Sequence, residues 1–285
     1  MSVFPQTRDD YSGGWTSLLA LRLRRHFALK FVGITAFTWI FFIGYFSLLR
    51  APAFPPVVMP LLGLDHMIPF QPVALFAYLS LWLYVGFAPG LQLTFIEFLA
   101  YGAWIALLCI TGLTLFYFWP TAIPPIAYDA GGFPGFALLQ GVDASGNACP
   151  SMHVAVAIYS AIWVDRMLLE SGAPRWVRVF NWTWFAAIAW STLAIKQHVV
   201  LDAMAGAVLG IAFAAASLRW RPRPARPSAP VSVDAHTRAT VATVATVATV
   251  ATVATVATVA TVAAVAAVAA VAAAPSDIIV SSKMK

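Results

Sequence analysis

Charged side chains are scarce in this chain. Of its 285 residues only 10% are Asp, Glu, Lys or Arg, whereas 61% are hydrophobic. A soluble domain usually carries about 25% charged residues, so this chain has too few to cover a surface that faces water. The mean hydropathy of +0.83 points the same way. The composition excludes an ordinary water-soluble domain and predicts a polytopic membrane protein.

Cysteines and metal-ligand patterns are also few. The two cysteines are Cys109, inside an apolar run, and Cys149, next to a later one, so we expect no disulfide between them. The histidines and acidic residues show no metal-ligand spacing such as His-Glu-x-x-His, and we expect neither a metal nor another cofactor. The net charge of +6 does not indicate a nucleic-acid partner, because the basic residues lie between apolar segments and no RNA-binding motif occurs.

Six apolar segments dominate what is present. A bilayer-spanning helix takes roughly 17–25 residues, and spans without barrel-like alternation should be helical because a helix satisfies its own backbone. The first segment exceeds the roughly 7–15 residues of a signal-peptide core, so it is interpreted as a retained helix. The sequence therefore predicts an all-α bundle of six transmembrane helices over 29–49, 72–88, 97–119, 152–168, 177–195 and 199–218.

The basic residues set an expected orientation. Cytoplasmic connections of membrane proteins carry an excess of Lys and Arg. Alternate connections here hold most of the basic residues, and the opposite ones hold only Arg50 and Lys196. We expect cytoplasmic termini and outward-facing loops at 50–71, 120–151 and 192–198. The composition is typical of a bacterial inner membrane, where the outer side is the periplasm.

The expected domains follow from these segments. A cytoplasmic segment, 1–28, precedes a membrane domain over 29–218, and an Arg/Pro-rich linker follows at 219–239. The tail, 240–285, begins with Thr-Val-Ala repeats. On a helix a three-residue repeat lags about 60° per unit and builds no fixed apolar face. This favours a low-complexity tail, although its length leaves a seventh span as an alternative.

Two polar motifs begin apolar segments near the outer side. His198 and Asp202 are four residues apart and would share a helix face. Asp202 could then accept a hydrogen bond from one ring nitrogen of His198 and make the other nitrogen more nucleophilic. A carboxylate just inside a membrane segment is a candidate for function, but a purely structural His–Asp pair at a helix end is the alternative.

The other motif is Pro150-Ser151-Met152-His153. Ser151 is a good N-cap for the helix that follows, and a helix start favours a bound phosphate. His153 is placed to protonate a leaving alkoxide, and Lys196 could neutralise phosphoryl oxygens. Taken singly, these residues could be an ordinary cap, an interfacial histidine and a snorkelling lysine. Together they predict a metal-free phosphoryl-transfer site.

The two motifs resemble those of the type 2 phosphatidic acid phosphatase superfamily. Pro-Ser-x-His matches at residues 150–153, and Ser-x6-His-x3-Asp matches at Ser191, His198 and Asp202. The resemblance covers about 29–218 and implies six helices with an outward-facing site. It implies that His198 attacks phosphorus to give a phosphohistidine and that Asp202 orients it. His153 would protonate the departing alcohol and then activate water or an acceptor alcohol, with Ser151, Ser191 and Lys196 binding phosphate.

A narrower resemblance concerns a subgroup. The stretch 64–70 with Pro72 and Tyr78, the stretch 119–125, and Lys196-Gln197-His198 are similar to bacterial relatives of fungal inositol phosphorylceramide synthase. The superfamily's first motif, a lysine followed by Arg-Pro, is absent, and Thr192 stands where an arginine is expected. We expect a lipid-phosphate phosphatase, because the two histidines and the carboxylate fit that chemistry. The alternatives are a head-group phosphotransferase with the same histidines and a non-catalytic lipid transporter or binding protein.

Overall fold

The computed structural model describes residues 14–125 and 146–222. These residues are mostly helical, as expected. The predicted tail, 240–285, and most of the linker, 219–239, lie outside the described residues. In chain order the elements are α1 (Trp15–Arg24), α2 (Phe27–Arg50), β1 (Val57–Val58), α3 (Gly63–Met67), η1 (Pro72–Ala74), α4 (Leu75–Leu79), α5 (Leu81–Gly90), α6 (Phe95–Phe118), β2 (Thr121–Ala122), α8 (Met152–Glu170), α9 (Arg175–Ala194) and α10 (Val200–Arg219).

Five of the predicted spans coincide with segments long and apolar enough to cross a membrane. These segments are Phe27–Arg50, Pro72–Gly90, Phe95–Phe118, Met152–Glu170 and Val200–Arg219. The predicted segment 177–195 coincides with α9, which is not among these five although it has 20 residues. Its first turns carry Arg175 and Arg178, which lower its apolar character. The second span is built from η1, α4 and α5 rather than from one continuous helix.

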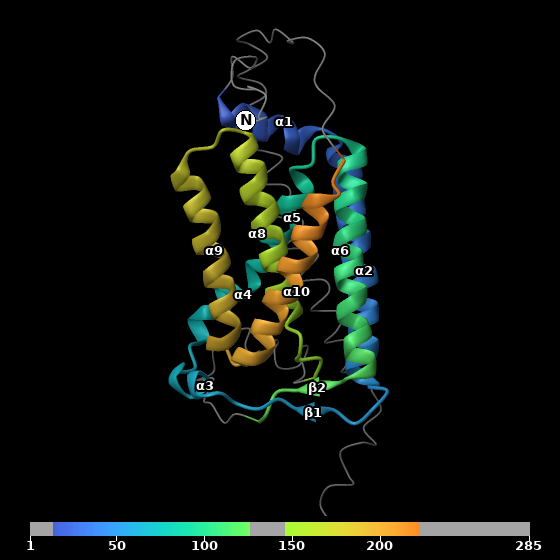
Figure 1. Cartoon of the computed structure of the whole chain (residues 1–285), viewed down its shortest axis with the longest axis vertical. Helices are drawn as coiled ribbons and strands as arrows, with labels where there is room; N and C mark the ends of the chain where they lie inside the picture. Colours follow the sequence, from blue (N-terminus) through green and yellow to red (C-terminus); the bar gives the residue numbers. More distant parts are fainter. Residues whose placement is uncertain (1–13, 126–145, 223–285) are drawn as a thin grey trace, which may run out of the picture.

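The elements sort toward two ends of the bundle. In Figure 1, α2, α6, α8, α9 and α10 run along the long axis, α1 crosses one end, and α3, β1 and β2 lie at the other. Helix α1 falls inside the segment 1–28, for which no helix was predicted. Strands β1 and β2 form a parallel pair with Val57 opposite Thr121. Thr121 Oγ1 accepts a hydrogen bond from the Cys149 N–H (2.7 Å), which ties this pair to the chain leading into α8.

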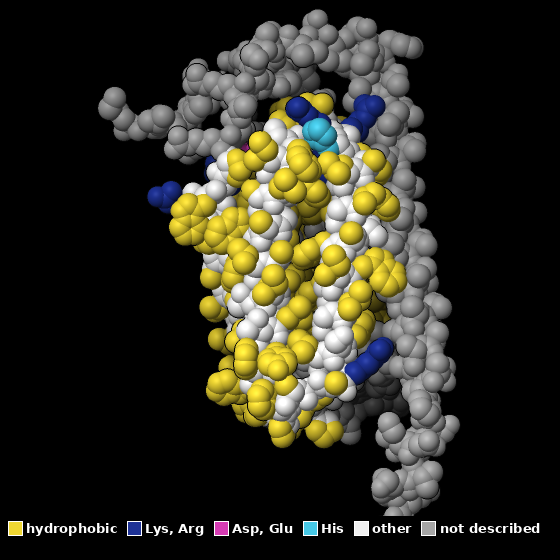
Figure 2. All heavy atoms as spheres, turned by 90° about the vertical axis from the view of Figure 1, so that its right-hand side faces the viewer, with side chains coloured by type: hydrophobic (Ala, Val, Ile, Leu, Met, Phe, Trp, Pro, Cys, Tyr) yellow, Lys and Arg dark blue, Asp and Glu magenta, His cyan; other side chains and the backbone are white. Residues whose placement is uncertain are grey.

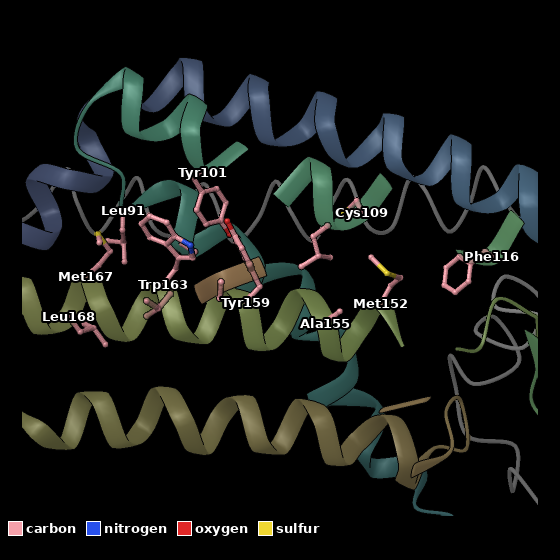
Figure 3. Close-up of a cluster of buried hydrophobic side chains, with 14 residues drawn as sticks. Leu91, Tyr101, Cys109, Phe116, Met152, Ala155, Tyr159, Trp163, Met167 and Leu168 are labelled. Atoms are coloured by element: carbon pink, nitrogen blue, oxygen red, sulfur yellow. The ribbon is translucent and has the colours of Figure 1, made fainter. Parts of the chain in front are cut away.

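Helix α8 forms the centre of the bundle, because it packs against α5, α9 and α10. The largest core cluster joins Tyr101 and Cys109 of α6 to Tyr159 and Trp163 of α8 (Figure 3). The Trp163 Nε1–H donates to Ser217 Oγ on α10 (2.8 Å), so the buried indole N–H is satisfied. Lipid tails are as apolar as these side chains, so close packing rather than the hydrophobic effect holds such helices together.

Two glycines bring α10 against the backbone of α8. A Cβ on Gly206 would lie 2.2 Å from the Ser151 carbonyl oxygen, and one on Gly210 would lie 2.3 Å from that of Ala155. Residues four apart share a helix face, so the two glycines form one small-residue stripe. Asp202 precedes Gly206 by one turn on the same stripe. The stripe therefore places Asp202 beside the N-terminus of α8.

One face of the bundle is apolar along its length. Figure 2 shows hydrophobic side chains over most of this face. On α2, Val32, Ile40 and Ile43 are exposed, and on α6, Ile96 and Ile110 are exposed. A surface of this kind is costly in water and is satisfied by lipid. The apolar helices fit an integral membrane protein.

Charged contacts gather at the α1 end. The Glu170 carboxylate at the end of α8 accepts from Arg166 Nε (2.9 Å) and pairs with Arg221 and with Arg22 (3.8 Å). Nearby, the buried Lys30 ammonium donates to the carbonyls of Arg22 (2.6 Å) and Gly90 (2.8 Å). These contacts tie α1, α2, α8 and the end of α10 together. They lie at the end of α8 opposite to Ser151 and His153.

Candidate active site

The second motif forms a hydrogen-bonded pair at the start of α10. His198 lies in the short connection between α9 and α10, and its Nδ1 is 3.1 Å from Asp202 Oδ2. Asp202 is fully buried and His198 is 7% exposed. Because an ionised carboxylate only accepts, the bond requires the proton on Nδ1 and leaves the imidazole lone pair on Nε2. The predicted hydrogen bond is present and sets the tautomer suited to a nucleophile.

The connection itself is held by backbone hydrogen bonds. The N–H groups of Gln197 and His198 both donate to the Thr192 carbonyl, at 3.0 and 3.1 Å. Lys196 has a φ of 60°, in the left-handed region that residues other than glycine rarely adopt. The chain therefore turns sharply after α9 and directs the imidazole of His198 toward α8.

The first motif forms the start of α8. Ser151 is the N-cap, and its Oγ accepts a hydrogen bond from the Val154 N–H (3.3 Å), as predicted. The Ser151 N–H donates to the Asp202 carbonyl (2.9 Å). This bond joins the two motifs directly, although they are far apart in the sequence. The first turn of α8 and the first turn of α10 therefore lie side by side.

His153 faces His198 across this junction. The two imidazole centroids are 5.6 Å apart, with their planes inclined by 58°. The other face of His153 stacks on Tyr78 of α4 (4.5 Å, 25°), and Trp82 of α5 meets it edge-on at 5.8 Å. Tyr78 and Trp82 thus belong to the site although sequence reasoning gave them no role there. Aromatic residues four apart on an apolar helix look like ordinary core residues in a sequence.

Two polar atoms of this junction are buried without a partner. Among the described residues, His153 Nε2 and Asp202 Oδ1 have no hydrogen-bond partner. A buried polar atom left unpaired costs roughly 1–3 kcal/mol, so native proteins retain few of them. Both atoms belong to the residues that the two motifs predict as catalytic. Asp202 Oδ1 needs a donor, such as the O–H of water or of an alcohol, whereas a protonated His153 Nε2 could donate to a phosphoryl oxygen.

The remaining predicted phosphate-binding residues are engaged with backbone carbonyls. Ser191 is fully buried, and its Oγ donates to the Ile188 carbonyl (2.7 Å) within α9. The Lys196 ammonium donates to the carbonyls of Asp65 (3.2 Å) and Ile68 (2.5 Å). An ammonium carries three N–H donors, and these two contacts use two of them. Lys196 lies in the same connection as His198, whereas Ser191 lies in the last turn of α9.

Other reactive groups near the site have different properties. Burial, and then the Asp202 carboxylate, raises the pKa of the Cys149 thiol above its ordinary value. A thiol of raised pKa stays protonated near neutral pH and is a poor nucleophile. Within 14–125 and 146–222, no group of three or more His, Cys, Asp or Glu side chains is placed to hold a metal ion.

Comparison with models of known protein families assigns the chain to a family. The model of the PAP2 superfamily matches residues 73–226, more than half of the chain. The chain belongs to the PAP2 superfamily. The matched stretch contains Ser151, His153, Ser191, Lys196, His198 and Asp202. Membership in the PAP2 superfamily points to a phosphatase or phosphotransferase. No curated protein matches the chain, and no solved structure does either. The closer likeness to inositol phosphorylceramide synthase stays a prediction.

Proposed function

We propose that this PAP2 protein is an integral-membrane lipid-phosphate phosphatase that works through a phosphohistidine on His198. One observation carries the proposal. Two histidines from separate motifs face each other with their centroids 5.6 Å apart, and one of them is hydrogen-bonded to a buried carboxylate at 3.1 Å. This arrangement offers a nucleophile, its orienting group and a separate proton donor.

The first chemical step uses both histidines. The lone pair on His198 Nε2 forms an N–P bond with the phosphoryl group while the ester P–O bond breaks. The protonated His153 gives its proton to the leaving oxygen, and an alcohol departs. The Asp202 carboxylate stabilises the positive charge that develops on His198, as an orienting carboxylate does in comparable triads.

The second step reverses these roles. Neutral His153 takes a proton from water, whose oxygen forms a P–O bond while the N–P bond breaks. Inorganic phosphate leaves and His198 returns to its starting state. An acceptor alcohol in place of water would make the same site a phosphotransferase, so the identity of the acceptor separates the two activities.

The phosphate would bind at the start of α8. Helix N-termini favour anions through their N–H groups and dipole, and Ser151 caps this one. We propose that Ser151 and the third N–H of Lys196 complete the phosphate site in place of the superfamily's missing basic residues, joined by Ser191 once its O–H turns from the Ile188 carbonyl to the phosphate. Asp202 Oδ1 and His153 Nε2 are buried without a hydrogen-bond partner among the described residues.

The membrane arrangement belongs to the same proposal. At about 1.5 Å per residue, the 20 residues of α9 are long enough to span the bilayer core, which gives six spans. The ion cluster of Arg22, Arg166, Arg221 and Glu170 would then face the cytoplasm, where basic residues concentrate. The site at the opposite end of α8 would open to the outer, periplasmic side of a bacterial inner membrane. The lipid head group would enter there with its tails between the helices.

The test is phosphate release by purified protein in detergent, from a panel of lipid phosphates without added metal. The panel holds phosphatidic acid and an isoprenoid diphosphate as phosphate donors. An inositol phospholipid, which is a phosphodiester, is added as a head-group donor and should release no phosphate. The proposal expects release by the wild type, none by His198→Ala, and full release by His26→Asn. His26 is an exposed histidine at the other end of the bundle, and asparagine tolerates its φ of 58°.

The alternatives give different results in the same panel. A phosphotransferase would release no phosphate but would transfer a head group when inositol or diacylglycerol is added, again only with His198 present. A lipid transporter or binding protein would show neither reaction, and lipid binding would survive His198→Ala. Equal release by the wild type and His198→Ala would overturn the proposal.

A further inference from the structure

A buried carboxylate outside the two motifs contacts the start of α10. Asp65 of α3 is 8% exposed. Its Oδ1 accepts a hydrogen bond from the Val200 N–H at 2.8 Å, and its Oδ2 accepts one from the Leu62 N–H at 2.8 Å. The N-cap of α10 is Val199, which supplies no side-chain cap. Helix α10 thus receives its capping oxygen from a residue 135 positions earlier in the chain.

Lys196 adds a second contact between the same two segments. Its ammonium donates to the carbonyls of Asp65 (3.2 Å) and Ile68 (2.5 Å), which come from α3 and the residue after it. We call the contacts that Asp65 and Lys196 make across these two segments the α3 clasp. Positions 196 and 200 flank His198 on both sides. The clasp therefore fixes the connection that carries the nucleophile.

The connection needs such support because its conformation is unfavourable by itself. Lys196 adopts a φ of 60°, which for a residue with a Cβ persists only when the surroundings determine it. The first N–H groups of a helix also lack partners unless a cap supplies them, and an uncapped first turn frays. Asp202 lies in the first turn of α10, so fraying would move its carboxylate away from His198.

We propose that Asp65 is a positioning residue for the His198–Asp202 pair. By capping α10 from α3, it holds Asp202 Oδ2 at 3.1 Å from His198 Nδ1 and so keeps the proton on Nδ1. Lys196 acts in the same clasp through the carbonyls it binds. The catalytic consequence rests on the proposed function, whereas the positioning of the imidazole does not.

The direct test observes the histidine and needs no substrate. In protein labelled with ¹⁵N-histidine, the ring nitrogens report which of them carries the proton, and the spectrum of His198→Gln assigns the signal. The wild type should show His198 protonated on Nδ1 alone, and Asp65→Ala should show a mixture of tautomers. Glu97→Ala is the matched control. Glu97 caps α6 by accepting from the N–H groups of Leu93 (3.1 Å) and Thr94 (2.9 Å) at the other end of the bundle.

The activity test then links this position to catalysis. Misplacing a catalytic group by 1 Å can cost about 100-fold in rate, so Asp65→Ala should lower kcat by about 10- to 100-fold with KM unchanged. Asp65→Asn keeps one acceptor oxygen and should recover part of the loss. Lys196→Met should shift the His198 tautomer in the same direction. A lysine that only binds phosphate would instead raise KM and leave the tautomer unchanged.

The outcomes separate the two proposals. A folded Asp65→Ala protein with His198 still protonated on Nδ1 alone would overturn the positioning role. A tautomer mixture in that variant, together with a wild type that turns over no lipid phosphate, would support the positioning role and defeat the proposed function. If Asp65→Ala does not fold, Asp65→Asn and Lys196→Met decide the matter by the same spectrum.

Discussion

Substituting Gly206 with alanine should disable the site without touching any catalytic group. The new Cβ would lie 2.2 Å from the Ser151 carbonyl oxygen, and the nearest atoms after it are Ser151 backbone atoms at 3.1 and 3.2 Å. Ordinary van der Waals contact begins at 3.4 Å, so the first distance is short by 3.4 − 2.2 = 1.2 Å. The atom in the way belongs to the backbone of Ser151 and cannot rotate aside as a side chain could, so α10 and α8 must move apart by about 1 Å.

That separation acts directly on the junction of the two motifs. It would break or lengthen the 2.9 Å hydrogen bond from the Ser151 N–H to the Asp202 carbonyl, and would move Asp202 and His198 away from His153. A misplacement of about 1 Å can cost about 100-fold in rate. Overpacking of this kind also costs typically 1–3 kcal/mol of stability, so the variant should melt earlier but still fold.

The assay compares lipid-phosphate turnover by the wild type, Gly206→Ala and a control glycine. Gly102→Ala on α6 is the control, because a Cβ there would meet nothing within 4 Å. We expect about a 100-fold fall in kcat for Gly206→Ala and wild-type turnover for Gly102→Ala. If a folded Gly206→Ala protein turned over substrate within threefold of the wild type, the close approach of α10 to α8 would not position the site.

The remaining predictions concern single side chains. Asp202→Asn should lower kcat by about 10⁴-fold while KM changes little, because an amide can donate as well as accept and no longer fixes the imidazole tautomer. Steady-state kinetics test this, and a fall in kcat of less than tenfold would contradict it. Tyr78→Leu should lower kcat by about tenfold, because it removes the ring that stacks on His153. Tyr78→Phe keeps the ring and should have a kcat close to that of the wild type. An equal fall in kcat in both variants would show that the hydroxyl matters instead. Glu170→Gln should lower the melting temperature in detergent and leave kcat unchanged, because losing hydrogen bonds to a charged group costs about 1.5–3 kcal/mol of folding free energy. An unaltered melting curve would show that the ion cluster adds nothing to stability.

The sequence predicted those structural features that depend on residues close together in the chain. The helix ends near Phe27, Phe95 and Val200 follow from where apolar runs begin. Ser151 was recognisable as an N-cap from its residue type and place. The His198–Asp202 hydrogen bond follows from a spacing of four residues on a helix. Each of these features is determined by a few adjacent residues.

Features that depend on distant partners could not be predicted in this way. Asp65 bonds to Val200, which is 135 positions away, and nothing beside it in the sequence indicates that contact. Lys196 was expected to face phosphate, but two of its donors lie on carbonyls of the α3 segment. Tyr78 and Trp82 contact His153 from α4 and α5, and no local signal in the sequence gave either residue that role. The second span consists of η1, α4 and α5, whose α4 and α5 pack against α9 and α8, and its apolar run alone did not indicate these interruptions.

The most direct test of the account is to trap the phosphoenzyme. Purified protein would be mixed briefly with lipid phosphate carrying labelled phosphorus, quenched in alkali to preserve phosphohistidine, digested and mapped by mass spectrometry. The account predicts label on the peptide containing His198, no label in His198→Ala, and accumulated label in His153→Ala when an activated ester with a good leaving group replaces the lipid. Labelled phosphate released with no phosphoenzyme at any time, or label on a residue other than His198, would contradict it.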